Sequence, residues 1–266
     1  MNSLHQIVQD LFASGKADLV LGYEKGTGDR RRPVIVKSAR EVEKLVFDEK
    51  CSHNLSVYIT RPEYKSRHHI LLFTSATTLR SVVRLAGENQ LTGKNLTFIL
   101  NRGDNAFEIA EGIEALLNQA RPEDLVIHAD TGELISRLDK MTREERFSFW
   151  KDQFANCMKC YACRAACPVC YCTACTVEIN QPQWITVPSS LAGNFEWHIM
   201  RMMHMAGRCV DCGACEAACP VGIPLNMITR NIIREIENNF GTESLSLQNK
   251  NVLSTFQPTD KENFIK

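Results

Sequence analysis

The sequence offers little that would point to a membrane-bound, secreted or nucleic-acid-binding protein. No stretch approaches the roughly 18 consecutive apolar residues that a membrane-spanning helix requires. The first segment, MNSLHQIVQDLFASGK, has no charged start followed by an apolar core, so we expect no secretory signal peptide. Lysine and arginine total 31, and aspartate and glutamate also total 31, which leaves no net charge to attract nucleic acid or anionic lipid. These absences favour a soluble protein of the cytoplasm.

Motifs for substrate chemistry are equally scarce. Gly22, Gly26 and Gly28 match the spacing of neither the dinucleotide-binding motif nor the P-loop, and we interpret this stretch as a flexible loop between strands. The arginines at residues 30–32 offer a contact for an anion or a partner. The sequence contains no identifiable Ser-His-Asp arrangement and no pair of catalytic carboxylates. We therefore predict no catalytic residue.

What the sequence does contain is cysteine, and eleven of the twelve cysteines fall between residues 157 and 219. Eight of them form the spacing Cys-x2-Cys-x2-Cys-x3-Cys-Pro twice, at Cys157, Cys160, Cys163 and Cys167, and again at Cys209, Cys212, Cys215 and Cys219. This spacing is typical of paired 4Fe-4S clusters, in which three thiolates of one motif bind one cluster and the fourth binds its neighbour. We therefore predict two clusters with crossed ligands: Cys157, Cys160, Cys163 and Cys219 bind the first, and Cys209, Cys212, Cys215 and Cys167 bind the second.

Two other interpretations of the repeated motif are weaker. A disulfide framework requires an oxidising compartment and usually a short secreted chain. A zinc ribbon uses two Cys-x2-Cys pairs, so a third cysteine at the same step and a following Cys-Pro would have no role in a tetrahedral site. The motif therefore favours an iron–sulfur protein that transfers electrons.

Four cysteines remain outside this pattern: Cys51, Cys170, Cys172 and Cys175. Three of them lie close together in CPVCYCTAC, and the fourth lies far upstream. Together they would complete a third tetrathiolate site, and four sulfur ligands suit either a third 4Fe-4S cluster or a zinc ion. Free, buried cysteines are the remaining interpretation, since free cysteine is among the most buried residue types.

Residues 1–140 alternate between predicted strands and helices, which favours an α/β domain with a largely parallel sheet. Strands are predicted at residues 19–23, 33–36, 54–60, 69–74, 96–100 and 124–128. Helices are predicted at residues 4–12, 39–47, 77–90 and 107–120, and a mostly helical stretch at 132–154 leads to the first cysteine motif.

Residues 141–245 are predicted to form an α-helical, ferredoxin-type dicluster domain, followed by a tail at 246–266 with partner docking as one role. Apolar side chains recur with helical spacing in two stretches, at Phe195, Ile199, Met202 and Met203, and at Met227, Ile228, Ile232 and Ile236. We interpret the methionines, His198 and His204 as packing residues, because thiolates already fill the expected sites. Arg164, Arg201 and Arg208 lie near predicted ligands; they either raise the cluster potentials or are ordinary surface charges.

The phrases CMKCYACRAACPVCYCTAC and HMAGRCVDCGACEAACPVGIPL resemble the helical ferredoxin domain of heterodisulfide-reductase-like electron-transfer subunits. Upstream, RPVIVKSAREVEKLVFDEKCSHNLSVYI and LRSVVRLAGENQL resemble the β-subunit family of deazaflavin-linked hydrogenases and formate dehydrogenases. The resemblance implies a subunit of an anaerobic redox complex, with heterodisulfide-reductase-like, formate dehydrogenase or hydrogenase proteins as partners. It also implies that Cys51, in a similar Cys-Ser-x-Asn-Leu context, pairs with the cysteines of CYCTAC.

The chain departs from this family at residues 75–80. Many relatives have Lys-Gly-Cys-Asp-x-Arg where this chain has Ser-Ala-Thr-Thr-Leu-Arg, so only the arginine is kept. A hydroxyl cannot replace a thiolate as a soft metal ligand, and we expect the α/β domain to serve as a docking scaffold. The predicted function is a non-catalytic relay of single electrons between a flavin- or metal-containing partner and another carrier. A flavin-containing reductase acting on a soluble redox cofactor and a cluster-bearing sensing module are the alternatives.

Overall fold

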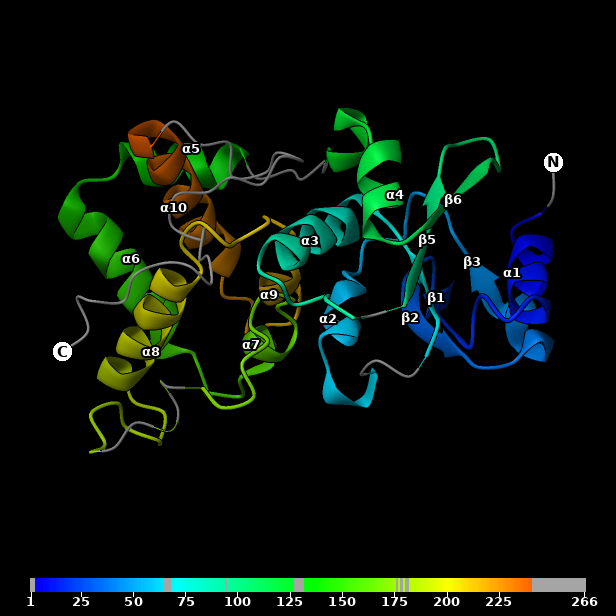
Figure 1. The fold of residues 1–266 in the computed structure, drawn as a ribbon. Coiled ribbons are helices and arrows are strands. Elements are labelled where there is room, and N and C mark those ends of the chain that lie inside the picture. The colour runs from blue at the N-terminus through cyan, green and yellow to red at the C-terminus, as the bar shows by residue number, and fades with distance from the viewer. Residues whose placement is uncertain are drawn as a thin grey trace, which may run out of the picture.

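The computed structural model describes residues 3–64, 68–93, 95–126, 132–175, 177, 179 and 182–240. These residues form an α/β part, on the right in Figure 1, and a helical part on the left. The α/β part ends before residue 127 and the helical part begins at residue 132. This order of an α/β region followed by a helical region confirms the sequence prediction, while the predicted tail at 246–266 lies outside the described residues.

One mixed sheet organises the α/β part. Its strand order is β2-β1-β4-β5-β6, with the short β3 paired to β1. The strands are β1 (Leu19–Lys25), β2 (Arg31–Val36), β3 (Leu45–Val46), β4 (Ile70–Phe73), β5 (Leu96–Asn101) and β6 (Phe107–Glu111). Among the strands of the described residues, only the pairs β1–β4 and β4–β5 are parallel, and β2, β3 and β6 run antiparallel to their neighbours. The expectation of a largely parallel sheet is therefore wrong outside its centre.

The central strands form the core of this part. All four residues of β4 are buried, as expected for a central strand with a continuous apolar sequence. Phe73 stacks on Phe47 with ring centroids 5.0 Å apart, and Phe98 of β5 is fully buried. Burying an apolar side chain of this size contributes about 1.5–3 kcal/mol to the free energy of folding. The buried strands therefore stabilise the sheet against which the helices pack.

The α-helices of the α/β part are α1 (Leu4–Ala13), α2 (Ser56–Ile59), α3 (Ala76–Gly87) and α4 (Ile113–Gln119). The predicted helices at 4–12 and 77–90 are thereby confirmed. In Figure 1, α1 lies at the end of the α/β part far from the helical part, whereas α3 lies next to the helical part. Helix α3 is therefore placed to connect the two.

Residues 54–60, predicted as a strand, instead contain the short helix α2. Asn54 favours this turn, because its side-chain oxygen accepts a hydrogen bond from the Ser56 backbone N–H at 3.2 Å and another from the Ser56 hydroxyl. Leu55 and Ile59, four residues apart, are buried in the core. The β-branched residues of this stretch favour a strand by composition, but the local bonds of an asparagine compete with strand pairing.

Three further predicted elements differ from the structure. Residues 107–111 form β6 instead of a helix, because the chain reverses at Asp104 and Asn105, both with positive φ, and pairs with β5. Residues 39–47 form a 3-10 helix (Ala39–Lys44) followed by β3. The strand predicted at 124–128 is wrong at its start, where Pro122–Leu125 is a 3-10 helix; residues 127 and 128 lie outside the described residues.

The helical part contains α5 (Gly132–Lys140), α6 (Arg143–Ala155), α7 (Ala162–Ala165), α8 (Leu191–His204), α9 (Ala214–Ala217) and α10 (Leu225–Phe240). A capping box starts α6: the Glu145 N–H donates to the Thr142 hydroxyl at 3.2 Å, and the Thr142 N–H donates to the Glu145 carboxylate at 2.7 Å. Phe154, near the end of α6, is fully buried and stacks on His198 of α8 with centroids 4.5 Å apart. This contact holds the start of the first cysteine motif against α8.

The apolar pattern places α8 correctly but misplaces its buried face. Met202 is buried, whereas Met203 is 60% exposed and Ile199 is 38% exposed. Trp197 and His198 occupy the buried face instead. The apolar spacing misses them because aromatic and polar side chains, which the cysteine motifs contact, take these positions. None of the helices in the described ranges is both long and apolar enough to cross a bilayer.

Candidate metal centres

The two cysteine motifs share a backbone conformation as well as a spacing. Lys159 and Asp211, each two residues after the first cysteine of its motif, have φ of 54° and 55°. Tyr161 and Gly213, each one residue after the second cysteine, have φ of 59° and 70°. The short helices α7 and α9 follow at once. Non-glycine residues held in this left-handed region cost about 1–3 kcal/mol each, so the repeated strain marks both loops as functional.

These loops direct backbone N–H groups at cysteine sulfur. The Lys159 N–H donates to Sγ of Cys157, and the Asp211 N–H donates to Sγ of Cys209, both at 3.4 Å. A hydrogen bond from a backbone amide stabilises the charge of a thiolate. Each loop therefore offers an N–H donor to the first cysteine of its motif, an arrangement that suits a thiolate ligand.

A small cavity in the helical part is lined by Cys157, Cys160, Cys163 and Cys219, together with Trp197 and His198. Three of its cysteines come from the first motif and Cys219 comes from the second. The Nε2 atom of His198 lies 3.3 Å from Sγ of Cys157. Burial, with Arg201 and Lys159 nearby, lowers the pKa of His198 to about 4, so its ring is neutral at pH 7.

A second cavity is lined by Cys167, Cys209, Cys212 and Cys215, together with Arg201 and Met205. Its composition mirrors the first cavity, since three cysteines come from the second motif and Cys167 comes from the first. Helices α7 and α9 pack against each other and bring the last cysteine of each motif to the opposite cavity. The structure thus gathers the same two sets of cysteines that the spacing predicts, while their ligation stays a prediction.

Buried donors beside the cavities fit a sulfur-rich occupant. Among the atoms that the structure describes, Nε1 of Trp197 and Nε of Arg201 are buried without a hydrogen-bond partner. Trp197 lines the first cavity and Arg201 lines the second. An unpaired buried donor costs about 1–3 kcal/mol, and cluster sulfur accepts such bonds. Four soft thiolates with nearby N–H donors are therefore a donor set suited to a 4Fe-4S cluster in each cavity.

Burial favours the protonated form of several of these thiols when no metal is bound. Burial raises the pKa of Cys163 to about 11 and that of Cys209 to about 12. Burial likewise raises the pKa of Cys212 to about 11, although the side chain of Asn54, from the α/β part, acts in the opposite direction. Buried thiols of this kind become ligands when a metal takes the place of their protons.

Cys51 lies in the core of the α/β part, apart from both cavities. Its Sγ accepts a hydrogen bond from the Asp48 N–H at 3.4 Å, and only 4% of the residue is exposed. Burial raises the pKa of Cys51 to about 12. Cys209 shares the raised pKa and the backbone N–H donor, but Cys51, unlike Cys209, lines neither of the two cavities.

Cys170, predicted to share a site with Cys51, lies beside Cys167 instead. A hydrogen bond with Cys167 and burial raise the pKa of Cys170, and its Sγ is 4.0 Å from Sδ of Met205. Across the described ranges, no hydrogen bond joins Cys51 to another cysteine, and no three Cys, His, Asp or Glu side chains meet as ligands of a single metal ion. Tyr171 nevertheless packs against the core that contains Cys51, so the CPVCYCTAC segment does reach the α/β part.

Helix α3 and the residue that follows it contact the second motif through polar side chains on one helical face. Arg80, Arg84 and Glu88 are spaced four residues apart and so share one helical face. Arg80 donates to the Val210 carbonyl at 3.3 Å, and Glu88, just after α3, accepts two bonds from Arg208 at 2.9 and 2.8 Å. Arg80, the one residue of 75–80 that matches the Lys-Gly-Cys-Asp-x-Arg segment, therefore contacts the second motif directly.

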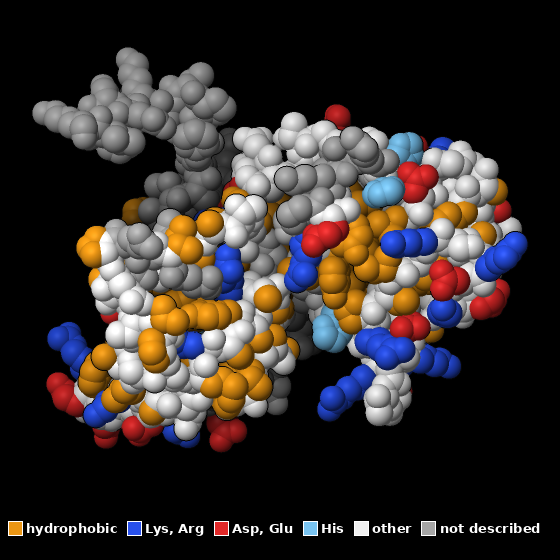
Figure 2. Space-filling view, turned by 90° about the horizontal axis from the view of Figure 1, so that it is seen from below, with side chains coloured by type: hydrophobic (Ala, Val, Ile, Leu, Met, Phe, Trp, Pro, Cys, Tyr) orange, Lys and Arg blue, Asp and Glu red, His pale blue; other side chains and the backbone are white. Residues whose placement is uncertain are grey.

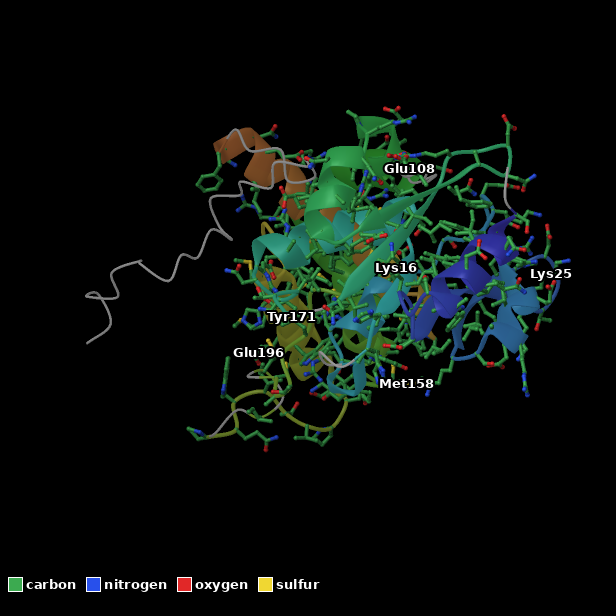
Figure 3. All side chains as sticks on the ribbon, turned by 45° about the vertical axis from the view of Figure 1, so that its right-hand side comes forward. Lys16, Lys25, Glu108, Met158, Tyr171 and Glu196 are labelled. Atoms are coloured by element: carbon green, nitrogen blue, oxygen red, sulfur yellow. The ribbon has the colours of Figure 1, made fainter. Side chains whose placement is uncertain are left out.

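Tyr171 reinforces this junction. Its hydroxyl donates to Glu88 at 2.8 Å, and the Arg208 guanidinium lies 5.1 Å from its ring centroid. Figure 3 labels Tyr171 where the chain of the helical part meets the α/β part. Glu88 thus accepts hydrogen bonds from both Tyr171 and Arg208, and Arg208 also stacks on Tyr171. These contacts join the CPVCYCTAC segment, the end of α3 and the second motif.

Two other sequence features have local roles. The hydroxyls of residues 75–80 bond to one another and to the core: Ser75 Oγ lies 3.2 Å from the Tyr23 hydroxyl and 3.1 Å from Thr78 Oγ1. In the arginine run, Arg31 forms an ion pair with Asp48 at 2.6 Å, and Arg32 pairs with a glutamate of β1. Both side chains are thereby held within the α/β part.

Three residues with roles at the cavities or the second motif are not predicted from the sequence: Trp197, which lines the first cavity, Asn54, which lies beside Cys212, and Glu88, which binds Arg208. A signal for Glu88 is present, since Arg80, Arg84 and Glu88 recur every four residues on an otherwise apolar helix. No comparable signal marks Trp197 or Asn54, because single aromatic and amide residues occur in every core.

Comparison with known proteins agrees with the cysteine spacing. Residues 153–223 match the family described as a 4Fe-4S dicluster domain, which confirms the prediction of two 4Fe-4S clusters. Over 112 residues the chain is 32% identical to the F420-dependent formate dehydrogenase subunit beta of Methanocaldococcus jannaschii, a match that covers 41% of this chain and 29% of that subunit. Over 57 residues it is 36% identical to the F420-dependent formate dehydrogenase 1 subunit beta of Methanococcus maripaludis, covering 21% of this chain and 14% of that subunit.

The matches thus span less than a third of the length of these relatives. They confirm the resemblance to formate dehydrogenase β subunits that the sequence analysis predicts. The resemblance to heterodisulfide-reductase-like subunits stays a prediction.

Proposed function

We propose that this iron–sulfur protein, a relative of the β subunits of F420-dependent formate dehydrogenases, is an electron-transfer subunit of a larger oxidoreductase complex. The observation that carries the proposal is the pair of cysteine-lined cavities within a 4Fe-4S dicluster domain. A 4Fe-4S cluster, when bound, takes up and releases single electrons. Two such centres close together suit conduction between proteins.

The cysteines of each cavity would hold its cluster with crossed ligands, as in a ferredoxin-type domain. Cys219 joins the first set and Cys167 joins the second. The backbone N–H groups of Lys159 and Asp211 stabilise the thiolate charge. Phe154 and Trp197 belong to the same buried apolar cluster as Cys163, which keeps water from the inner side of the first cavity.

The two cavities differ in their access to the surface. Cys160 of the first cavity is exposed, and the rim residues Met158 and Val221 are 58% and 37% exposed. Figure 3 shows Met158 at the lower edge of the molecule. In the second cavity the corresponding Cys212 is half-buried, and Val210 of its lining accepts a hydrogen bond from Arg80 of α3. We propose that the first cluster exchanges electrons with the partner. The second cluster, which is less exposed, exchanges electrons with the first.

The surface of the helical part suits this role. Apart from Val126, the exposed large hydrophobic side chains of the described residues all belong to it, Met158, Trp184 and Met203 among them. Figure 2 shows hydrophobic side chains gathered over the helical part on the left and more charged side chains over the α/β part. Exposed apolar surface of this kind is typical of protein–protein contacts.

The proposed setting is an anaerobic complex in the cytoplasm. A formate dehydrogenase-like protein is the partner that the relatives' names favour, and hydrogenase and heterodisulfide-reductase-like proteins are the other candidates. We propose residues 1–140 as the docking domain, 141–245 as the ferredoxin-like domain and 246–266 as a tail for partner contact. The subunit itself carries out no substrate chemistry in this proposal.

Cys51, Cys170, Cys172 and Cys175 are proposed as a third site, for a 4Fe-4S cluster or a zinc ion. The support is the clustering of the last three residues and the contact of Tyr171 with the core around Cys51. Cys51 lies in the core of the α/β part and Cys170 lies beside Cys167, so the proposed site would draw its ligands from both parts of the chain.

Metal analysis of anaerobically purified protein tests the function. Two 4Fe-4S clusters give about eight irons and eight sulfides per chain, and a third gives about twelve. Reduction should produce electron paramagnetic resonance (EPR) signals, and an oxidoreductase that copurifies should reoxidise the clusters. A bound flavin with turnover of a soluble cofactor would support the reductase alternative instead. Clusters that no partner protein reoxidises would support a sensing module.

A further inference from the structure

Arg201 differs from the other two arginines near the cysteine motifs. Arg208 is held by the carboxylate of Glu88, and Arg164 donates to the carbonyl of Cys172 at 3.0 Å. Arg201 lines the second cavity. It also reaches toward the first cavity, because its Nη2 donates to the carbonyl of Cys163 at 3.0 Å. Its guanidinium therefore lies between the two proposed cluster sites.

The charge of Arg201 is buried without a carboxylate. Only 4% of the residue is exposed, and its Nε has no hydrogen-bond partner. No aspartate or glutamate in the part of the chain that the structure describes forms an ion pair with it. Buried charges are costly unless an opposite charge compensates them, so the compensating charge must come from another group in its surroundings.

Cysteine thiolates that hold a cluster would supply that negative charge. Cys167 and Cys215 line the second cavity together with Arg201. A guanidinium keeps its charge in proteins, so the charge of Arg201 acts most strongly on a group bound in the second cavity.

We propose that Arg201 is the internal counter-charge of the cluster pair and raises the reduction potential of the second cluster more than that of the first. Reduction adds one negative charge to a cluster, and a fixed positive charge nearby favours the reduced form. Electrons that enter at the exposed first cluster are thereby drawn to the inner one. The proposal rests on the proposed function only in requiring that both cavities hold clusters.

The first cavity has a different cation, Lys159. Its ammonium donates to the carbonyl of Thr186, and burial lowers its pKa. Lys159 also differs from Arg201 in lining the first cavity and not the second. The two cations therefore act on different clusters, and they can be tested separately.

The test is a redox titration of the full chain, purified anaerobically and followed by EPR. Cys160→Ser identifies the signal of the first cluster, and iron is counted for every variant. We expect Arg201→Met to lower the potential of the second cluster, to lower that of the first by less, and Arg201→Lys to restore most of the difference. Arg164→Met, which removes an arginine outside the cavity, is the matched control and should leave both potentials unchanged.

Several results would overturn the role of Arg201. These are unchanged potentials in Arg201→Met, an Arg201→Lys variant as low as Arg201→Met, or an equal shift in Arg164→Met. If Arg201→Met does not hold both clusters, Arg201→Gln replaces it. If neither uncharged variant holds the second cluster while Arg201→Lys does, the second cluster requires a positive charge at residue 201, as proposed. If Arg201→Lys also fails to hold it, Arg201 has a structural role instead. Fewer than about eight irons in the unmodified chain contradicts the proposed function instead.

Discussion

Glu88 of the α/β part and Arg208 of the helical part form a two-point ion pair, with Nε–Oε1 at 2.9 Å and Nη2–Oε2 at 2.8 Å. Arg208 directly precedes Cys209, the first cysteine of the second motif. Helix α3, which ends next to Glu88, thereby fixes the position of a predicted cluster ligand. The α/β part thus holds the start of the second motif in place, in addition to its proposed role in docking.

Replacing Glu88 with alanine should destabilise the protein and loosen the junction. Removing one partner of a buried ion pair costs about 3–5 kcal/mol, because the other charge is left uncompensated. We expect the lower end of this range, since Arg208 is 21% exposed. The free energy of unfolding, measured by denaturant titration, checks this expectation.

The matched control for Glu88 is Glu111→Ala. Glu111 forms an ion pair of similar length, 2.6 Å, with Lys16, but both side chains are more than half exposed. Exposed pairs contribute about 0–1 kcal/mol. Equal losses of stability in the two variants would show that the Glu88 pair does not fix the junction.

Phe154→Ala should destabilise the helical part and the first cluster site. Phe154 is fully buried between α6 and α8, and replacing such a side chain with alanine costs about 3–5 kcal/mol. Because Phe154 stacks on His198, whose Nε2 contacts Cys157, iron should be lost from the first site before the second. Iron content and thermal unfolding measure both effects.

The control for Phe154 is Phe147→Ala. Phe147 lies about two helical turns before Phe154 on α6, and its side chain is 56% exposed. A small change in stability and full iron content are expected. Iron lost equally from both variants would argue against a specific role of the Phe154 stack at the first site.

Elements that depend on local sequence are predicted correctly, whereas elements that depend on a single side chain or on pairing with a distant strand are not. The central strands could be predicted, because β1, β4 and β5 each contain a short apolar run bounded by polar or turn residues, which favours a buried strand. The stretch NLSVYIT could not, because the single Asn54 side chain favours a turn over strand pairing. Residues 107–111 contain the same kinds of residue as a helix start, and only pairing with β5 makes them a strand.

The two cysteine sets could be predicted because the spacing encodes contacts within one loop and between two loops. Arg201 could be marked as a candidate but not selected from Arg164 and Arg208, since sequence proximity does not show which guanidinium lines a cavity. Glu88 lies 120 residues before Arg208, and no local pattern links them. Long-range polar pairs of this kind are decided by packing.

Cys51→Ser tests the proposed third site. If Cys51 binds a metal together with the cysteines of CYCTAC, the variant should lose about four irons, or one zinc, while the paired clusters remain. Metal analysis of the variant and the parent chain measures this. Unchanged metal content would assign Cys51 to the core as a buried thiol, the role favoured by its burial and by the contact of its Sγ with Asp48 Oδ1 at 3.6 Å.

The most direct test of the account is whether the ligands cross between the motifs. EPR spectra of the reduced protein would be compared for Cys160→Ser, Cys212→Ser and Cys219→Ser, each with its iron counted. The account predicts that Cys219→Ser perturbs the same cluster signal as Cys160→Ser, although Cys219 and Cys212 belong to one motif. A Cys219→Ser variant that perturbs the signal affected by Cys212→Ser would contradict it.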